Sequence, residues 1–303
     1  MRRAVAHAGR PAFSDVVGDL LGIDDGVAVI DTRHGQVEVV LDDVAFAKPA
    51  PPSTADELAL QAVAAAGWQP AEAEWLGGWL LRADHGFSRR ANSVLPLRQP
   101  GLPLADALAA ARDWYAARGL PLLLQLPTEA RRLLDAELGE QFWPTEAEAV
   151  VYAARLDRIA APATVPVVLS DVASDEWSAV YFAGVNDDPG LRAACRELLA
   201  RHERVAFASV HLDGRTVAVA RGVVDEGWLG LSAVAVDPGY RRQGLAGSLL
   251  AGLRDWARAL GASRSYLQVE ADNAPAIALY EKLGYWAHHE YRYRRDPGPG
   301  ETP

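Results

Sequence analysis

The segment from Val234 to Gly247 most constrains what this chain can fold into. It reads Val-Ala-Val-Asp-Pro-Gly-Tyr-Arg-Arg-Gln-Gly-Leu-Ala-Gly, an apolar strand that stops at a proline, followed by a glycine-rich turn that opens a helix. A helix start offers unpaired N–H groups and the positive end of a dipole, and both attract anions. Small residues let the backbone approach the anion closely, and arginines lie beside it. The segment therefore predicts a phosphate-binding turn between a strand and a helix.

A second segment, Asn273 to Tyr285, follows after one further helix and strand. It reads Asn-Ala-Pro-Ala-Ile-Ala-Leu-Tyr-Glu-Lys-Leu-Gly-Tyr. Together the two segments resemble the acetyl-CoA site of the GNAT acetyltransferase superfamily. The resemblance implies an α/β fold with a mixed, mostly antiparallel sheet flanked by helices. It also implies a transferase in which an amine attacks the thioester of acetyl-CoA directly, without a covalent enzyme intermediate.

The resemblance also assigns roles to residues of both segments. The turn amides are expected to hold the pyrophosphate, and the strand before the turn is expected to pair with the pantetheine arm. Asn273, also a helix N-cap, is expected to bond that arm, and Tyr280 matches the general acid that protonates the departing thiolate. The implied cofactor-binding residues are Val234, Ala235, Val236, Arg241, Arg242, Gln243, Gly244, Leu245, Ala246, Gly247 and Asn273.

The general base is less clearly marked. Gln268 stands where some relatives have a glutamate, and an amide cannot accept a proton. Glu270 lies two residues further on the same strand face and is the first substitute, followed by Asp225 and Glu226. At pH 7 a lysine amine of pKa about 10.4 is almost never free, whereas about 10% of an α-amine with a pKa near 8 is free. The missing glutamate therefore favours an α-amino acceptor.

The acceptor remains open between an amino acid such as glutamate and a peptide N-terminus. A protein lysine, a polyamine or an antibiotic is the alternative, and a non-catalytic protein that senses acyl-CoA or binds a partner is another. Arg89 and Arg90 either contact a carboxylate of the acceptor or form a sheet edge. Trp75, Trp79 and Trp228 are candidates for the wall of a cleft.

Charge and composition narrow the class of partner. The net charge of -10 argues against nucleic acid and against an anionic membrane surface. No run of about 18 apolar residues is present, so no membrane span is expected. The single cysteine, Cys195, cannot form an intrachain disulfide, which favours a reducing cytoplasm. His288 and His289 have no carboxylate or cysteine at ligand spacing, so no metal is expected.

The element pattern predicts a division of the chain. Short strands and turns up to a Pro-rich linker at Lys48 predict an SH3-like β-barrel, which resembles actinobacterial GNAT proteins. The barrel is expected to pack on the catalytic unit, to mediate a homodimer or to recognise a partner. A leading GNAT-like half without a phosphate turn is expected next, with helices over 55–66 and 104–118 and strands over 75–82 and 91–97. The expected divisions are residues 1–52 (barrel), 53–160 (leading half), 161–296 (acetyl-CoA-binding domain) and 297–303 (disordered tail).

Overall fold

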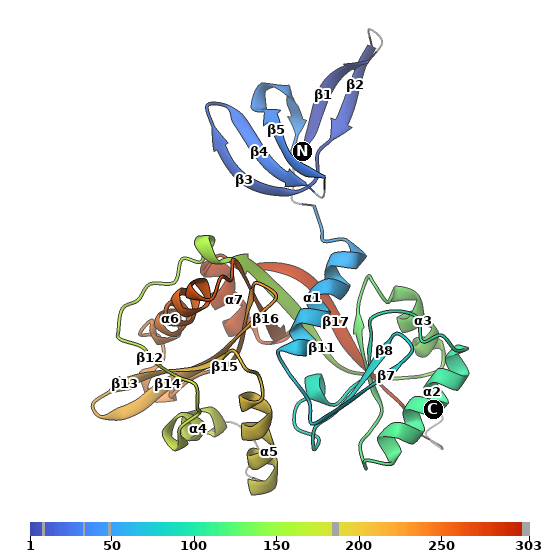
Figure 1. Ribbon diagram of the computed structural model, residues 1–303, viewed down its shortest axis with the longest axis vertical. Coiled ribbons are helices and arrows are strands. Elements are labelled where there is room, and N and C mark those ends of the chain that lie inside the picture. Colours follow the sequence, from blue (N-terminus) through green and yellow to red (C-terminus); the bar gives the residue numbers. More distant parts are fainter. Residues whose placement is uncertain (8–9, 33, 48–49, 184–187, 299–303) are drawn as a thin grey trace. The chain divides into compact units, whose positions relative to one another are not determined.

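The computed structural model describes residues 1–7, 10–32, 34–47, 50–183 and 188–298. The chain forms two compact units, Met1–Pro52 and Ser53–Pro303 (Figure 1). The linker predicted at Lys48 lies partly outside the described residues, and so do residues 299–303 of the predicted disordered tail.

The first unit is built from two antiparallel three-stranded sheets, with strand orders β2-β1-β6 and β3-β4-β5. Strands β3 and β4 are joined at Asp25 and Gly26, which both have positive φ, as the predicted turn requires. Ile30 and Val39 are buried between the strands and form part of a small apolar core. The elements are β1 (Arg2–His7), β2 (Arg10–Asp15), β3 (Asp19–Asp24), β4 (Val27–Thr32), β5 (Gly35–Val40), η1 (Leu41–Asp43) and β6 (Val44–Phe46).

The second unit is organised around one eight-stranded sheet with the order β10-β17-β11-β16-β15-β14-β13-β12. All neighbours are antiparallel except β15 and β16, which are parallel. The mixed, mostly antiparallel sheet expected from the sequence is therefore confirmed. The strands are β10 (Leu123–Pro127), β11 (Thr145–Arg155), β12 (Val168–Ser170), β13 (Val205–Leu212), β14 (Arg215–Asp225), β15 (Trp228–Val236), β16 (Arg264–Glu270) and β17 (Trp286–Arg295).

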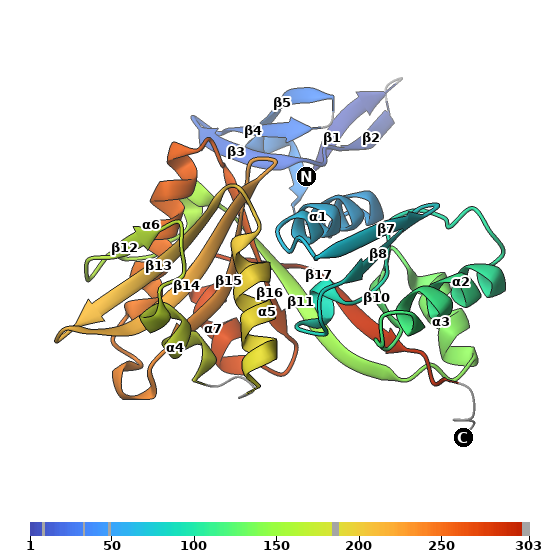
Figure 2. The ribbon, with the colours of Figure 1, turned by 60° about the horizontal axis from the view of Figure 1, so that its bottom comes forward.

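Helices cover both faces of this sheet. Alternate residues of β13 point to opposite faces, so Ala208 packs in the apolar cluster under α6 while Phe207 packs against α4 and α5. Accordingly α6 and α4 lie on opposite sides of these strands (Figure 2). The helices are α1 (Thr54–Ala66), α2 (Leu104–Ala116), α3 (Arg132–Glu140), α4 (Asp175–Phe182), α5 (Pro189–Ala200), α6 (Leu245–Ala259) and α7 (Ala274–Lys282).

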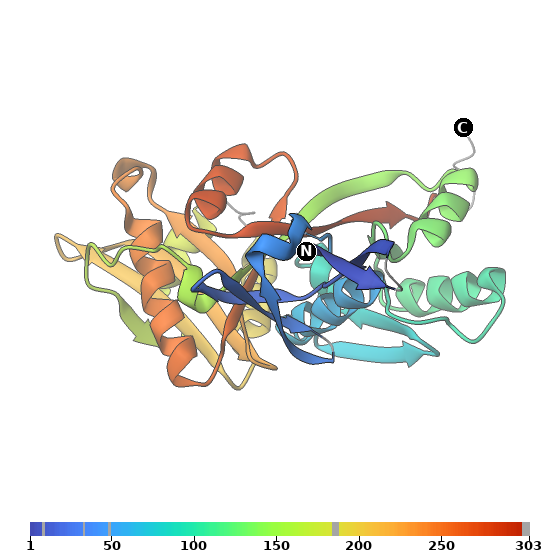
Figure 3. The ribbon, with the colours of Figure 1, turned by 90° about the horizontal axis from the view of Figure 1, so that it is seen from above.

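Strands from both ranges 53–160 and 161–296 share the large sheet. Strand β11 pairs with both β16 and β17, and β17 also pairs with β10. Figure 3 shows the long strands β11 (green) and β17 (dark red) running side by side through the unit. The last strand of the chain is thus held between two strands of the leading segment.

The predictions of two strands in the leading segment are wrong. The range 75–82 is a hairpin, β7 (Glu72–Leu76) and β8 (Trp79–Ala83), because Gly77 has a φ of +57° and turns the chain. Of the range 91–97 only β9 (Leu95–Pro96) is a strand, and η2 (Arg89–Ala91) precedes it. The Asn92 amide donates to the carbonyls of Asp84, Phe87 and Ser88 and holds this segment as a loop. Helix α3 and strand β12 were not expected.

Helix α1 begins where the sequence predicts. The Ser53 hydroxyl accepts from the Asp56 N–H while the Asp56 carboxylate accepts from the Ser53 N–H, which is a capping box. Helix α2 also matches its predicted range closely. The apolar faces of these helices pack toward β10 and the neighbouring strands.

Candidate functional site

The site is built on a split between the parallel strands β15 and β16. Their pairing ends at Leu231 and Leu267, although β15 continues to Val236 and β16 to Glu270. Beyond that point one edge of β15 still pairs with β14, while the edge that faced β16 is open. An open edge presents N–H and C=O groups with which an extended ligand can pair as an added strand.

A β-bulge re-aims the open edge of β15. Val219 and Arg221 of β14 face Ala235 and Ser232, so one residue of β14 lies opposite the two residues Ala233 and Val234. Ala233 has a φ of +52°, a conformation that costs energy for any residue other than glycine. Strain of this kind is concentrated at functional sites. No pattern in the sequence predicts this bulge.

A cavity of about 300 Å³ fills the split. Residues from β15, β16 and α7 contribute to its wall, namely Ser232, Ala233, Val234, Glu270, Asn273 and Tyr280. The structure thus brings the predicted residue of the strand edge, Val234, together with the two predicted residues of the second segment, although they are about 40 residues apart in the sequence.

The predicted phosphate turn follows directly from β15. The chain passes through η4 (Pro238–Tyr240), and Arg242 and Gly244 have φ values of +62° and +79° before α6 starts. Among the described residues, no hydrogen-bond acceptor is found for the N–H groups of residues 242–247. Free N–H groups at a helix start are the geometry that binds an anion. The turn therefore has a geometry that suits an anion such as a phosphate.

Side chains anchor this turn rather than fill it. Leu245, the first residue of α6, is buried. Gly247 packs against Pro162, and an added Cβ would lie 3.4 Å from the proline ring. The Arg241 Nε donates to the Val236 carbonyl at 3.3 Å, and Arg242 and Gln243 are exposed. None of the residues 241–247 lines the cavity in the split; the turn follows the end of β15, whose residues Ser232, Ala233 and Val234 do line it.

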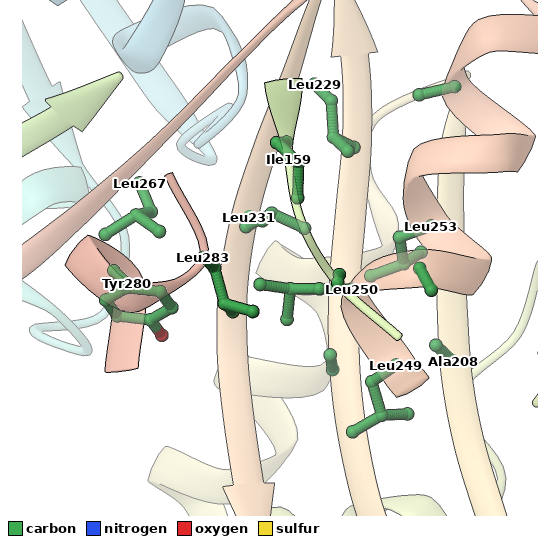
Figure 4. Packing of buried hydrophobic residues seen from close by; sticks show 14 of the residues in the cluster. Ile159, Ala208, Leu229, Leu231, Leu249, Leu250, Leu253, Leu267, Tyr280 and Leu283 are labelled. Atoms are coloured by element: carbon green, nitrogen blue, oxygen red, sulfur yellow. The ribbon is translucent and has the colours of Figure 1, made fainter. Parts of the chain in front are cut away.

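Asn273 and Tyr280 lie on the far wall of the split. The Asn273 Oδ1 accepts from the Ala276 N–H at 3.2 Å, so this residue is the N-cap of α7 as well as part of the cavity wall. Tyr280 is 8% exposed, and burial raises the pKa of its phenol to about 12. Figure 4 shows Tyr280 at the margin of the apolar cluster that contains Leu267 and Leu283. No hydrogen bond joins its hydroxyl to another described residue.

The candidate base Glu270 lies at the end of β16 and lines the cavity. Its Oε1 is 2.7 Å from Nη2 of Arg89, and 58% of its side chain is exposed. The Gln268 Oε1 accepts from the Tyr291 hydroxyl at 3.1 Å, so this amide has a structural partner. Asp225 pairs with an arginine at 3.7 Å and, like Glu226, lines neither cavity. Of the three carboxylates considered, only Glu270 is in position.

A second cavity of about 470 Å³ adjoins the first. The two cavities share four wall residues, Trp68, Arg90, Tyr181 and Glu270. The sequence singled out Arg90 but not Trp68, which follows the glycine that ends α1, nor Tyr181 on α4. The tryptophans proposed for a cleft line neither cavity: Trp79 is buried in the core of the leading segment, and Trp75 is 58% exposed.

Comparisons with known proteins identify the family. The family model described as "Probable histone acetyltransferase Rv0428c C-terminal" matches residues 54–294. The "Probable histone acetyltransferase Rv0428c" of Mycobacterium tuberculosis is 33% identical over 295 residues, which cover 93% of this chain and 89% of that protein. A structure of a GCN5-related N-acetyltransferase from Kribbella flavida has a TM-score of 0.61 at 20% identity and covers 81% of this chain and 97% of that one. The chain belongs to the GNAT family of N-acetyltransferases.

GNAT acetyltransferases use acetyl-CoA, so the split cavity and the turn belong to an acetyl-CoA-dependent N-acetyltransferase. A shorter match is found to "[Ribosomal protein bS18]-alanine N-acetyltransferase" of Escherichia coli (strain K12). It is 47% identical over 68 residues and covers 22% of this chain and 45% of that protein. Among the described residues of this GNAT chain, no helix is long and apolar enough to cross a membrane, and no group of three or more His, Cys, Asp or Glu side chains is arranged to hold a metal ion.

Proposed function

We propose that this GNAT enzyme transfers the acetyl group of acetyl-CoA to an α-amine. The observation that carries the proposal is the open, bulged edge of β15, which faces Tyr280 across one cavity and leads into a phosphate turn. This arrangement offers, in order along the chain, a strand edge for an extended arm and a helix start for the pyrophosphate.

The cofactor lies, in this proposal, along β15. The arm pairs with the open edge of Val234, Ala235 and Val236, and the amides of residues 242–247 hold the pyrophosphate. The positive φ of Gly244 supports this placement because it turns the amides toward one side without a Cβ in the way. The Asn273 Oδ1 caps α7, which leaves its Nδ2 to donate to the arm.

Tyr280 acts on the sulfur that leaves. Its phenol keeps its proton at neutral pH, because burial raises its pKa to about 12, so it is a hydrogen-bond donor. The hydroxyl has no partner among the described residues, and the side chain lines the cavity. We propose that this hydroxyl stabilises the thiolate as the bond to the acetyl carbon breaks.

Glu270 receives the proton of the attacking amine, directly or through water. It is the carboxylate that lines both cavities at the end of β16, and the Arg89 guanidinium holds it in place. The bond to Arg89 engages Oε1 and leaves Oε2 for the amine. Gln268, which has no basic group and is bonded by Tyr291, takes no part in this step.

An α-amino acceptor is favoured by two observations. The wall of the first cavity contains one carboxylate, Glu270, and this residue is engaged with an arginine, so the site suits an amine that is partly free at neutral pH. A relative with a short match is named for the α-amine of a ribosomal-protein alanine. The longer match to a protein named as a histone acetyltransferase makes a lysine of a protein the competing acceptor.

The test is release of the CoA thiol from acetyl-CoA with a panel of acceptors. The panel contains glutamate, other free amino acids, short peptides, polyamines, an aminoglycoside and an Nα-blocked lysine that offers only its ε-amine. Turnover with free α-amines, above the rate without acceptor, is expected. Turnover confined to the blocked lysine would refute the α-amine, and tight acetyl-CoA binding without turnover on any acceptor would refute the enzyme.

The remaining parts of the proposal concern the first unit and the setting of the enzyme. We propose that Met1–Pro52 is an SH3-like barrel that mediates a homodimer. The lone Cys195 is buried, and burial raises its thiol pKa to about 12, so it is an inert core residue and suits a reducing cytoplasm.

A further inference from the structure

Arg221 is a buried cation on the wall of the first cavity that forms no ion pair with a described carboxylate. It lies in β14 and is 2% exposed. Its Nε donates to the Leu199 carbonyl at 2.7 Å, its Nη2 to the Gly67 carbonyl at 3.2 Å, and its Nη1 approaches the Ser232 hydroxyl at 3.4 Å. A guanidinium has five N–H donors, so two of them remain. A buried charge is costly unless an opposite charge or several acceptors compensate it.

Arg90 is a second guanidinium at the same place. Its Nε donates to the Tyr291 hydroxyl and its Nη2 to the Gln268 carbonyl, which leaves three donors. Its guanidinium carbon and that of Arg221 each lie 5.7 Å from the Trp68 ring centroid, so they are no further apart than twice that distance. Arg90 lines both cavities. Two cations thus lie near one indole, and both line the first cavity.

None of the described groups around Arg90 and Arg221 forms an ion pair with either guanidinium. Burial raises the pKa of the Tyr181 and Tyr266 phenols, which therefore stay neutral, and the Arg221 guanidinium keeps its charge at pH 7 although burial lowers its pKa to about 10. Asp84 forms its ion pair with Arg201. The carboxylate of Glu270 is likewise bonded to an arginine other than these two. Among the described residues, the wall of the first cavity therefore carries two guanidiniums, Arg90 and Arg221, against the single carboxylate of Glu270.

We infer that Arg90 and Arg221 bind a carboxylate of the acceptor, which makes the acceptor a free amino acid rather than a peptide N-terminus or a protein lysine. This inference rests on the proposed function, since it names the acceptor class for the same site. In a free α-amino acid the amine and the carboxylate are separated by one carbon. A carboxylate on these guanidiniums therefore keeps the amine within the cavity that Tyr280 and Glu270 also line.

The carboxylate belongs to the acceptor rather than to the acyl group for a geometric reason. Arg90 lines the second cavity as well as the first, and that cavity includes neither the open edge of β15 nor Tyr280. A molecule that enters through the second cavity meets Arg90 before it reaches the split. A carboxyacyl-CoA would bring its carboxylate from the opposite side, along β15.

The experiment compares each L-amino acid with its own C-terminal primary amide as acceptor. The amide lacks the carboxylate, and its α-amine has a pKa of about 8. The carboxylate of the free amino acid makes its amine more basic, so a preference for the amino acid cannot come from a larger fraction of free amine. The variants are Arg90→Gln and Arg221→Lys. Arg82→Lys is the matched control, because Arg82 is 1% exposed and bonded to Ser93 and Gln125 but lines neither cavity.

We expect the wild type to prefer the amino acid by at least about 10-fold in kcat/KM. Each cavity variant should lower kcat/KM for the amino acid roughly 10- to 100-fold, the range for a hydrogen bond to a charged group, and leave the amide and the KM for acetyl-CoA unchanged. Arg82→Lys should keep the preference. Equal use of acid and amide by the wild type, or equal losses on both in the variants, would overturn the inference. If Arg221→Lys does not fold, Arg90→Gln decides alone.

Two further arms separate this inference from other sources of failure. A preference for succinyl-CoA over acetyl-CoA that depends on Arg90 would assign the carboxylate to the acyl group and overturn the acceptor assignment. Calorimetric binding of amino acids and amides in the presence of CoA needs no turnover. If the protein binds amino acids but not their amides, and Arg90→Gln abolishes this binding, the inference is supported even without acetyl transfer; only the proposed function then fails. If amino acids and amides bind equally well, the inference is overturned.

Discussion

Replacing Tyr280 with phenylalanine removes one hydroxyl at the point where, in the proposed mechanism, the thiolate leaves. The phenol has a pKa of about 12 and a thiol one of about 8.5, so full transfer of the proton to the sulfur is uphill by roughly 5 kcal/mol. A hydrogen bond to a charged acceptor contributes about 1.5–3 kcal/mol. The structure therefore favours stabilisation of the thiolate by a hydrogen bond over complete proton donation.

The expected loss in kcat for Tyr280→Phe is accordingly about 10- to 100-fold, with less than a twofold change in the KM for acetyl-CoA. General acid catalysis with full proton transfer reaches 10²–10⁴-fold and would exceed this range. The assay is the single-turnover rate with acetyl-CoA bound in advance, since slow product release would hide a change in the chemical step. An unchanged single-turnover rate would remove Tyr280 from the mechanism.

Tyr285→Phe is the matched control for this experiment. Tyr285 lies in the same apolar cluster, with its ring centroid 6.0 Å from that of Tyr280, but it lines neither cavity. Its hydroxyl is hydrogen-bonded to Ser265 at 2.8 Å. The two variants should therefore show opposite patterns: Tyr285→Phe loses about 1 kcal/mol of stability and keeps its rate, whereas Tyr280→Phe keeps its stability and loses rate.

Three further variants test the turn, the base and a buried histidine. Gly244→Ala should weaken acetyl-CoA binding roughly 5- to 30-fold in calorimetry, because a side chain at positive φ costs about 1–2 kcal/mol. Gly214→Ala, at a similar φ in the β13–β14 hairpin, is the control and should leave binding unchanged. Equal effects of the two variants would contradict the turn assignment. Glu270→Gln should lower kcat/KM about 10- to 100-fold at pH 7 and much less at pH 9, where the acceptor amine is already neutral; a loss independent of pH would exclude the base. Burial lowers the pKa of His289 from 6.5 to about 3. As the pH falls below 6.5, this histidine is therefore protonated in the unfolded chain but stays neutral in the folded one, which lowers the stability of the fold. Urea unfolding should show about 2 kcal/mol less stability at pH 5 than at pH 7.5 from this group, and His289→Gln should lack that part of the decrease.

Local patterns in the sequence predicted the elements of the site. The stop at Pro238 and the glycine-rich turn are local signals: β15 ends at Val236, before the proline, and α6 begins at Leu245, directly after Gly244. Ser53 is the N-cap of α1 and forms a capping box, a signal that is equally local. Such features depend on a few neighbouring residues, so they can be read without knowing the fold.

Features that oppose the apolar pattern, or that arise between strands, were missed or misread. The apolar run around Gly77 looks like one strand, because a hairpin is decided by which partners the two arms find. The loop at Asn92 is held by hydrogen bonds from its own side chain, and these compete with a strand that the apolar residues alone predict. The bulge at Ala233 leaves no mark in the sequence, since it arises from register against β14.

Within the proposed site, the cofactor-binding part could be predicted from the sequence, because a strand, a turn and a helix start that follow one another in the chain form it. The proposed acceptor-binding part depends on the tertiary structure. Trp68, Arg90, Tyr181 and Arg221 come from four separate elements and meet only because the leading segment and the last strands share one sheet. The burial of the Arg221 charge is likewise a property of the folded molecule. In the sequence Arg221 is one arginine in an apolar strand, whereas in the fold it is buried on a cavity wall without an ion pair to a described carboxylate.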